Sequence, residues 1–288
     1  MLMLELLLWL VAGGICVFSL ITYVFYIIFR LRRPPPALLE AACRGRRAAC
    51  LARGLASSLF ALACVCLAYP LGPLFGRLTC RLATGRGPTV VCLHGLYHNP
   101  TAFLGLRPAL VRAGLPRVAC LGYASLGGDF EALARGLAAR VRAMVPGDTP
   151  LCFVGHSLGG LLARRLAAEP DLAGRTCAVA TLGAPHGGSV LAALAVGRLG
   201  RSLAPRGPVA RAVAGLPDPP GAALLSLASP VDNLVVPLSG LCLGRAAWRE
   251  EATPPVSHIA MLYHPAVIAR VAAFLRPVAA AQSGAGNP

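Results

Sequence analysis

The first 29 residues form an apolar run that carries a single charge, Glu5. The part after Glu5 is long enough to cross the roughly 30 Å hydrocarbon layer of a membrane as a helix, which takes about 20 residues. The run lacks the basic start, the short apolar core and the small-residue cleavage site of a secretory signal peptide. We therefore expect residues 1–29 to form a transmembrane helix that ends at the charged segment beginning with Arg30.

A second uncharged run, residues 54–75, has a similar length, although Pro70 and Pro73 interrupt its last turns. We expect a second transmembrane helix here, with a helix lying in the membrane interface as the alternative. The loop between the runs, residues 30–53, holds seven Arg and one acid, so the positive-inside rule predicts that it faces the cytoplasm. In a bacterial inner membrane, the rest of the chain would then be periplasmic if residues 54–75 span, and cytoplasmic otherwise.

The basic residues gather beside these apolar runs. All 27 basic residues are Arg, and ten of them lie in residues 1–86, together with two acids. Aromatic residues make up only 6% of the chain and are not interleaved with the Arg residues. Proteins bind nucleic acid through basic surfaces that often include aromatic side chains. The pattern therefore predicts a membrane, and no nucleic acid, as the partner.

From residue 78 the pattern changes to short apolar runs that alternate with helical stretches. Four runs are continuous and bounded by Gly or Pro, as strands buried on both faces are. They lie at 89–93, 117–122, 150–154 and 177–182, with helical stretches at 101–113, 130–145 and 158–168. Asp129 is placed to cap the second of these helices. The alternation predicts a parallel sheet covered on both sides over residues 78–277, followed by a disordered tail, residues 278–288.

The segment Gly155-His156-Ser157-Leu158-Gly159 joins one of these strands to a helix. A G-x-S-x-G sequence at such a junction forms a sharp turn in which the Ser backbone is strained and the flanking positions admit only glycine. The turn holds the Ser side chain at a helix N-terminus, where backbone N–H groups favour a developing negative charge. We expect Ser157 to be a nucleophile.

A nucleophilic Ser needs a general base, and the base needs an acid that orients it. Four of the six His residues lie in or before the motifs, which leaves His258 and His264 further along the chain. His258 lies in a loop, whereas His264 starts the helix that follows. We expect His258 to be the base and His264 to have a capping or surface role.

The choice of acid is narrow because the chain has only five Asp residues. Asp232 follows an apolar run and precedes His258 by 26 residues, which leaves room for one more strand and gives the order Ser, acid, His. We expect Asp232 to be the acid. Asp218 and the pair Glu250-Glu251 are the alternatives.

An acyl-transfer site also needs backbone N–H groups for the oxyanion. Leu158 follows the nucleophile, and the turn His94-Gly95-Leu96 follows the first strand of the sheet. We expect the N–H groups of Leu96 and Leu158 to form the oxyanion hole. His94 and His98 are expected to stabilise the turn through hydrogen bonds.

These segments, together with Thr181-Leu-Gly-Ala-Pro-His-Gly-Gly-Ser189, resemble the α/β-hydrolase superfamily, and specifically its bacterial lipase and esterase branch. The resemblance covers roughly residues 78–277 and implies the α/β-hydrolase fold and cleavage of lipid-like carboxylic esters through an acyl-enzyme. It also implies a short cap or lid at residues 189–222 and a structural role for His186 and Ser189.

No metal and no cofactor are expected. Secreted lipases of this kind often hold calcium through Asp residues and contain a disulfide, but this chain has few Asp and no evident Cys pair. It also has no C-x-x-C spacing that would suggest zinc. The Cys residues in the predicted strands are expected to be small buried apolar residues. They are Cys92, Cys120, Cys152 and Cys177.

Two other functions fit the same residues. An acyltransferase, a thioesterase or an amidase would use the same nucleophile, base and acid. A non-catalytic membrane scaffold could retain the fold without the chemistry, because fold does not imply function. The presence of a nucleophile, a base, an acid and an oxyanion turn together favours the membrane-anchored serine ester hydrolase.

Overall fold

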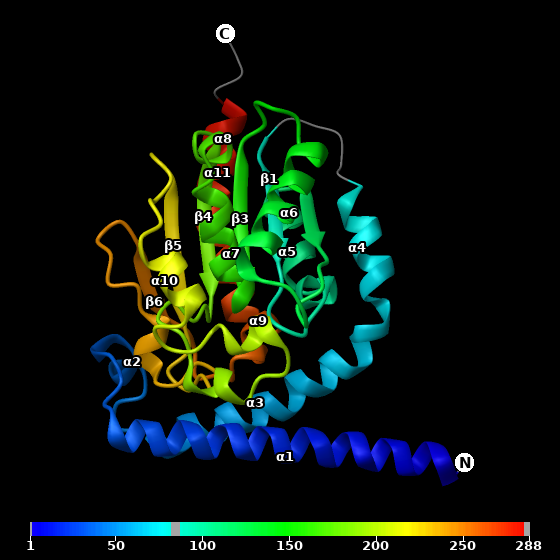
Figure 1. Ribbon diagram of the computed structural model, residues 1–288, viewed down its shortest axis with the longest axis vertical. Coiled ribbons are helices and arrows are strands. Elements are labelled where there is room, and N and C mark those ends of the chain that lie inside the picture. Colours follow the sequence, from blue (N-terminus) through cyan, green and yellow to red (C-terminus); the bar gives the residue numbers. More distant parts are fainter. Residues whose placement is uncertain (1, 82–86, 285–288) are drawn as a thin grey trace.

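The computed structural model describes residues 2–81 and 87–284, and its centre is a six-stranded parallel sheet (Figure 1). The strands lie in the order β2-β1-β3-β4-β5-β6, and each neighbouring pair is parallel. Their bounds are β1 Thr89–Leu93, β2 Val118–Leu121, β3 Leu151–His156, β4 Thr176–Leu182, β5 Ala223–Ala228 and β6 Arg249–Ala252. The predicted parallel sheet is confirmed, and all the strands end at the same edge.

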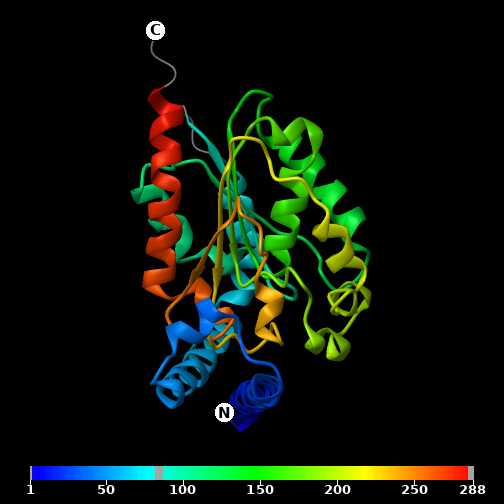
Figure 2. The ribbon, with the colours of Figure 1, turned by 90° about the vertical axis from the view of Figure 1, so that its left-hand side faces the viewer.

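Helices cover both faces of the sheet (Figure 2), as the alternation of the sequence predicts. Side chains alternate along β1, so that Val91 and Leu93 join one core while Val90 and Cys92 join the other. The first core contains α6 (Phe130–Met144), α7 (Leu158–Ala167) and α10 (Pro208–Ala214), and the second contains α5 (Leu106–Arg112) and α11 (Pro265–Gly284). Asp129 caps α6 by accepting a 2.7 Å hydrogen bond from the Ala132 N–H, as expected.

Short helical segments connect these elements: η2 (Pro100–Phe103), α8 (Pro170–Ala173), η3 (Val190–Leu194), α9 (Arg198–Arg201), η4 (Leu238–Leu241) and η5 (Ile259–Leu262), where η marks a 3-10 helix. The helix expected over residues 101–113 is divided into η2 and α5 around Gly105, a residue of low helix propensity. Cys92, Cys120 and Cys152 are fully buried in the strands, and Cys177 is half-buried.

The N-terminal part of the chain is helical: α1 and α3 lie below the ends of the strands, and α4 rises along the side of the sheet next to β2 (Figure 1). It consists of α1 (Leu2–Arg32), α2 (Ala37–Ala42), α3 (Arg47–Ala68), η1 (Tyr69–Leu71) and α4 (Gly72–Cys80). Two stretches, Glu5–Arg32 and Arg47–Cys80, are long and apolar enough to cross a membrane, by length and composition alone. Helices α1 and α3 pack against each other, with α1 seen end-on in Figure 2.

Three boundaries differ from the sequence-based expectations. The second apolar helix begins at Arg47 rather than residue 54, and the expected Arg-rich loop also contains α2. The segment expected as a disordered tail is helical as far as Gly284, because its run of Ala residues has high helix propensity. Residues 285–288 of that segment lie outside the described residues.

A third core cluster joins the N-terminal helices to the loop that follows β5. The Tyr23 hydroxyl donates to the Val231 carbonyl at 3.1 Å, and the Tyr26 hydroxyl donates to the Pro230 carbonyl at 3.0 Å. Leu39 of α2 is fully buried in the same cluster, which also includes side chains of the β5 loop and η4. The N-terminal helices are therefore packed on the sheet domain at the edge where its strands end.

Candidate active site

Ser157 lies in a sharp turn between β3 and α7, with φ 55° and ψ −124°. A positive φ is strained for a residue with a side chain, and here the neighbouring glycines make it possible. A Cβ atom at Gly155 would collide with the Gly159 carbonyl, and one at Gly159 would collide with the Leu93 carbonyl. The Ser157 N–H donates to the Leu182 carbonyl at 2.9 Å, which ties the turn to β4. The local sequence thus forms the expected strand–turn–helix geometry.

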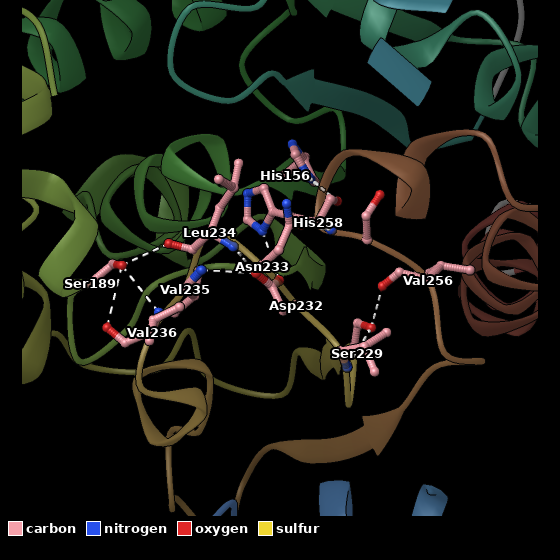
Figure 3. Close-up of polar contacts among 12 residues, drawn as sticks. His156, Ser189, Ser229, Asp232, Asn233, Leu234, Val235, Val236, Val256 and His258 are labelled. Carbon is pink, nitrogen blue, oxygen red and sulfur yellow. Dashed lines mark hydrogen bonds and ion pairs between the residues drawn. The ribbon is translucent and has the colours of Figure 1, made fainter. Parts of the chain in front are cut away.

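Asp232, in the loop after β5, and His258, in the loop after β6, lie next to each other (Figure 3). The His258 Nδ1 atom lies 2.7 Å from the Asp232 Oδ2 atom, and both side chains are almost completely buried. The other carboxylate oxygen of Asp232 accepts hydrogen bonds from the N–H groups of Leu234 and Val235, at 2.9 and 2.8 Å. These bonds orient the carboxylate, so its second oxygen remains directed at the imidazole.

The backbone of His258 is held from two further directions. His156, the residue before Ser157, donates from Nε2 to the His258 carbonyl at 3.0 Å, and the His258 N–H donates to the Asn233 Oδ1 atom at 3.1 Å. Burial, followed by the proximity of His258, lowers the pKa of His156 well below its ordinary value. His156 is therefore neutral at physiological pH and acts as a hydrogen-bond donor to the His258 loop.

The turn after β1 forms the other side of the site. His94 donates from Nδ1 to the Gly95 carbonyl at 2.9 Å and accepts from the Tyr123 N–H at 3.3 Å, while its ring stacks on that of Tyr123. His98 accepts from the Asn99 N–H at 2.8 Å. Burial lowers the pKa of both His94 and His98 to about 4, so both rings are neutral. These hydrogen bonds give both residues the turn-stabilising role that the sequence predicts.

The structure brings the two expected oxyanion residues to the neighbourhood of Ser157. Leu158 is the first residue of α7, where the N–H groups have no acceptor within the helix. Leu96 lines the same cavity as Ser157 and His258. The cavity has a volume of about 560 Å³. Its other lining residues are mainly apolar, and several of them come from the segment expected as a cap, including Leu191, Leu194, Val196 and Leu203.

The alternative acids and the second His lie elsewhere. Asp218 accepts from the Trp248 indole N–H at 2.8 Å and pairs with Arg245. Glu250 accepts from backbone N–H groups of the preceding loop, and Glu251 pairs with Arg270. His264 accepts from the Ala266 N–H at 3.3 Å at the start of α11, which is a capping role. Of the acids considered, the structure brings Asp232 to His258.

Two residues position the loop after Asp232: Ser189, for which the family resemblance implies a structural role, and Asn233, which went unrecognised in the sequence. The Ser189 hydroxyl donates to the Leu234 carbonyl at 2.7 Å and accepts from the Val236 N–H at 3.1 Å, so it holds the loop after Asp232 (Figure 3). Asn233 connects His258 to α1, because its Nδ2 atom donates to the Thr22 hydroxyl at 2.7 Å. The position of Asn233 next to Asp232 was the only signal for it, whereas Ser189 ends a recognisable motif.

Residues 2–81 and 87–284 contain no group of three or more His, Cys, Asp or Glu side chains that could hold a metal ion. The family model described as the alpha/beta hydrolase family matches residues 90–283. The chain is an α/β-hydrolase. The fold that the sequence predicts is thereby confirmed, and the match begins after the N-terminal helices.

Solved structures similar to this α/β-hydrolase include several lipolytic enzymes. A structure from work on LipS and LipT, two metagenome-derived lipolytic enzymes, is 18% identical, with a TM-score of 0.53, and the match covers 68% of this chain and 96% of that one. The lipase BlEst2 of Bacillus licheniformis is 16% identical, with a TM-score of 0.54 and coverages of 69% and 94%. Lipase B of Aspergillus fumigatus is 17% identical, with a TM-score of 0.54 and coverages of 69% and 52%. At these identities the likeness concerns the fold, and no curated protein matches the sequence.

Proposed function

We propose that this α/β-hydrolase is a membrane-associated serine hydrolase that cleaves lipid-like carboxylic esters through an acyl-enzyme. The observation that carries the proposal is the 2.7 Å contact between Asp232 and His258, in the cavity that also contains the strained Ser157. A nucleophile on a strained turn, an imidazole and a buried carboxylate are the groups that serine acyl transfer requires.

In the proposed reaction, the Ser157 hydroxyl attacks the ester carbonyl while His258 accepts its proton at Nε2. Asp232 holds the Nδ1–H of the imidazole and stabilises the imidazolium that forms. The N–H groups of Leu96 and Leu158 stabilise the oxyanion. When the tetrahedral intermediate collapses, His258 gives the proton to the departing alcohol. Water then attacks the acyl-enzyme with His258 again as the base, which releases the carboxylic acid and restores Ser157.

The cavity supports an apolar substrate. Apart from the catalytic side chains, its wall consists mainly of Leu, Val, Ile and Ala residues, and the side chains of Leu194 and Val196 in the cap segment are also exposed at the surface. A pocket with an apolar wall and a few polar groups at one place suits a ligand with a long apolar part and one reactive polar group. An ester of a fatty acid has this composition.

The faces of α1 support a membrane location. Its buried positions are the polar or aromatic residues Ser19, Thr22, Tyr23 and Tyr26, spaced as one helical face, and they contact the rest of the protein. Its opposite face is apolar and exposed, with Leu20, Val24, Ile27 and Ile28 among its residues. A helix on the surface of a water-soluble protein buries its apolar face and exposes its polar face. The exposed apolar face of α1 is therefore better suited to the hydrocarbon of a membrane than to water.

The packing of α2 bears on the side of the membrane. The Arg-rich segment between α1 and α3 contains α2, whose Leu39 is buried against the β5 loop and η4, so this segment and the hydrolase domain lie on the same side of any membrane. The positive-inside rule assigns such a segment to the cytoplasm. We therefore favour a cytoplasmic location for the hydrolase domain. This is the location expected if residues 54–75 do not cross the membrane. The docking of the domain on one side of the C-terminal half of α1, through Thr22, Tyr23 and Tyr26, also favours helices that lie along the bilayer surface.

Two measurements test the proposal. The wild-type protein should react with a fluorophosphonate probe and hydrolyse 4-nitrophenyl butyrate, and Ser157→Ala should lose both activities, whereas Ser202→Ala, a change in the cap segment outside the cavity lining, should retain them. Labelling that persists in Ser157→Ala would place the nucleophile elsewhere. For the location, a C-terminal fusion to green fluorescent protein should fluoresce and a fusion to alkaline phosphatase should be inactive. The opposite pair of results would make the domain periplasmic.

A further inference from the structure

The cavity that contains Ser157 has one wall made of the two N-terminal helices. Phe18, Ile21 and Thr22 of α1 and Leu62 and Val65 of α3 line it, together with residues of the cap segment. These residues precede the region that matches the hydrolase family, which begins at residue 90. The sequence assigns them to the membrane helices alone. The structure makes them part of the substrate-binding cavity.

This wall offers almost no polar group to a ligand. Thr22 contributes its only hydroxyl, which accepts from Asn233 and donates to the Phe18 carbonyl within α1. The remaining side chains are a Phe, an Ile, a Leu and a Val. A surface of this kind stabilises a hydrocarbon chain through burial and cannot satisfy the hydrogen bonds of a sugar, a headgroup or a peptide.

The wall also reaches the surface of the protein. Phe18 is 43% exposed and Ile21 is 49% exposed although both line the cavity, and across the opening Leu194 and Val196 are 65% and 67% exposed. The opening is therefore bordered by apolar side chains and is continuous with the exposed apolar face of α1. A hydrocarbon chain can pass from a bilayer in contact with that face to the cavity without crossing water.

We propose that α1 and α3 form the acyl-chain subsite of the enzyme, in which Ile21, Leu62 and Val65 set the length of chain that is accepted. The inference rests on the proposed function. It makes the substrate a long-chain ester resident in the bilayer, whose chain enters beside α1 while its carbonyl reaches Ser157. The N-terminal helices then serve both to hold the enzyme on the membrane and to select its substrate.

The test is a chain-length profile. We would measure kcat/KM of the full-length protein in detergent micelles for 4-nitrophenyl esters with 4, 8, 12 and 16 carbons. Each methylene buried in the subsite should raise kcat/KM about fourfold, which corresponds to ~0.8 kcal/mol, until the subsite is full. Ile21→Trp and Val65→Trp should shorten the subsite and lower the ratio of kcat/KM for the two longest esters to kcat/KM for the butyrate by about tenfold or more.

Matched controls carry the same substitution on the same helices. Val24→Trp on α1 and Leu67→Trp on α3 change exposed positions outside the cavity lining, so both should keep the wild-type profile. Should a Trp variant fail to fold, Ile21→Ala and Val65→Ala remove atoms instead and should extend the profile toward longer chains. Reaction of each variant with a short-chain fluorophosphonate at the wild-type rate would show that its catalytic groups are intact.

The outcomes separate the inference from the function on which it rests. A wild-type protein that neither hydrolyses any ester nor is labelled at Ser157 would refute the proposed function. A protein that hydrolyses esters, but whose chain-length profile is the same in the cavity variants, the Ala variants and the controls, would overturn the acyl-chain subsite alone.

Discussion

The contact between Thr22 and Asn233 allows a direct test of how α1 is docked on the loops that contain Asp232 and His258. Asn233 is 2% exposed and makes two hydrogen bonds, one from the His258 N–H and one to the Thr22 hydroxyl. Asn233→Ala leaves the buried His258 N–H without its acceptor, which costs about 1–3 kcal/mol, and removes the bond to Thr22, worth about 1 kcal/mol. We expect the free energy of unfolding to fall by roughly 2–4 kcal/mol.

Thr22→Val is the complementary change, because valine keeps the shape of threonine and removes the hydroxyl. It leaves one amide hydrogen of Asn233 without a partner in a buried place, at a cost of about 1–2 kcal/mol. In the double variant the Asn233 amide is absent, so Thr22→Val leaves no amide hydrogen unpaired. The substitution should then lower the free energy of unfolding by less than it does in the wild type. We therefore expect a coupling energy of about 1 kcal/mol in the double-mutant cycle.

The assay is equilibrium unfolding by urea in a mild detergent, followed by circular dichroism. Thr79→Val serves as the control partner for Asn233→Ala, because Thr79 accepts from the Cys120 N–H on β2, at the far end of the sheet from the β5 loop. This pair should be additive within about 0.5 kcal/mol. If Thr22→Val costs as much beside Asn233→Ala as it does alone, the two side chains do not touch, and the docking of α1 described above is wrong.

Three further changes test other parts of the structure. Gly159→Ala should abolish folding or fluorophosphonate labelling, because its Cβ atom would meet the Leu93 and His94 carbonyls; Gly136→Ala, an open position on α6, is the control. Burial lowers the pKa of His94 from 6.5 to about 4, so the unfolded state takes up its proton first as the pH falls. The contribution of neutral His94 to the free energy of unfolding should therefore be fully present above about pH 6.5 and be lost as the pH falls toward 4. The decline should be shallower in His94→Asn than in the wild type. Deletion of residues 1–32 should give an inactive protein rather than a soluble enzyme, because the Val231 and Pro230 carbonyls and Asn233 lose their partners on α1; a truncated protein with full esterase activity would contradict this.

The sheet and the turn at Ser157 could be predicted because their determinants are local. Strands buried on both faces need continuous apolar runs, and the turn admits only glycine at positions where a Cβ atom would meet backbone. The pairing of Asp232 with His258 could be predicted from the sequence for another reason. The chain has so few Asp residues that the order of nucleophile, acid and base left one good choice.

The rest of the site depends on contacts between residues far apart in the chain. The Ser57 hydroxyl of α3 accepts from the Ser257 N–H, beside His258, at 2.8 Å, and these residues are 200 positions apart. The hydropathy of α1 is that of a membrane helix and does not reveal whether its polar residues face a bilayer, another helix or a loop of the sheet domain. The spacing of Ser19, Thr22, Tyr23 and Tyr26 on one face was the available signal that α1 packs on protein.

Under the proposed function, this packing connects the position of the protein on a membrane with its chemistry. Tyr23 bonds the carbonyl of the residue before Asp232, and Thr22 bonds the residue after it, so α1 holds the acid loop on both sides. Ser57 of α3 bonds the residue before His258. His258 and Asp232 are thus each braced by a helix with exposed apolar side chains, and the turn at Ser157 is braced within the sheet by β4. A hydrolase domain separated from these helices would retain the turn at Ser157 but lose the supports of Asp232 and His258, so under the proposed function anchoring and catalysis depend on the same residues.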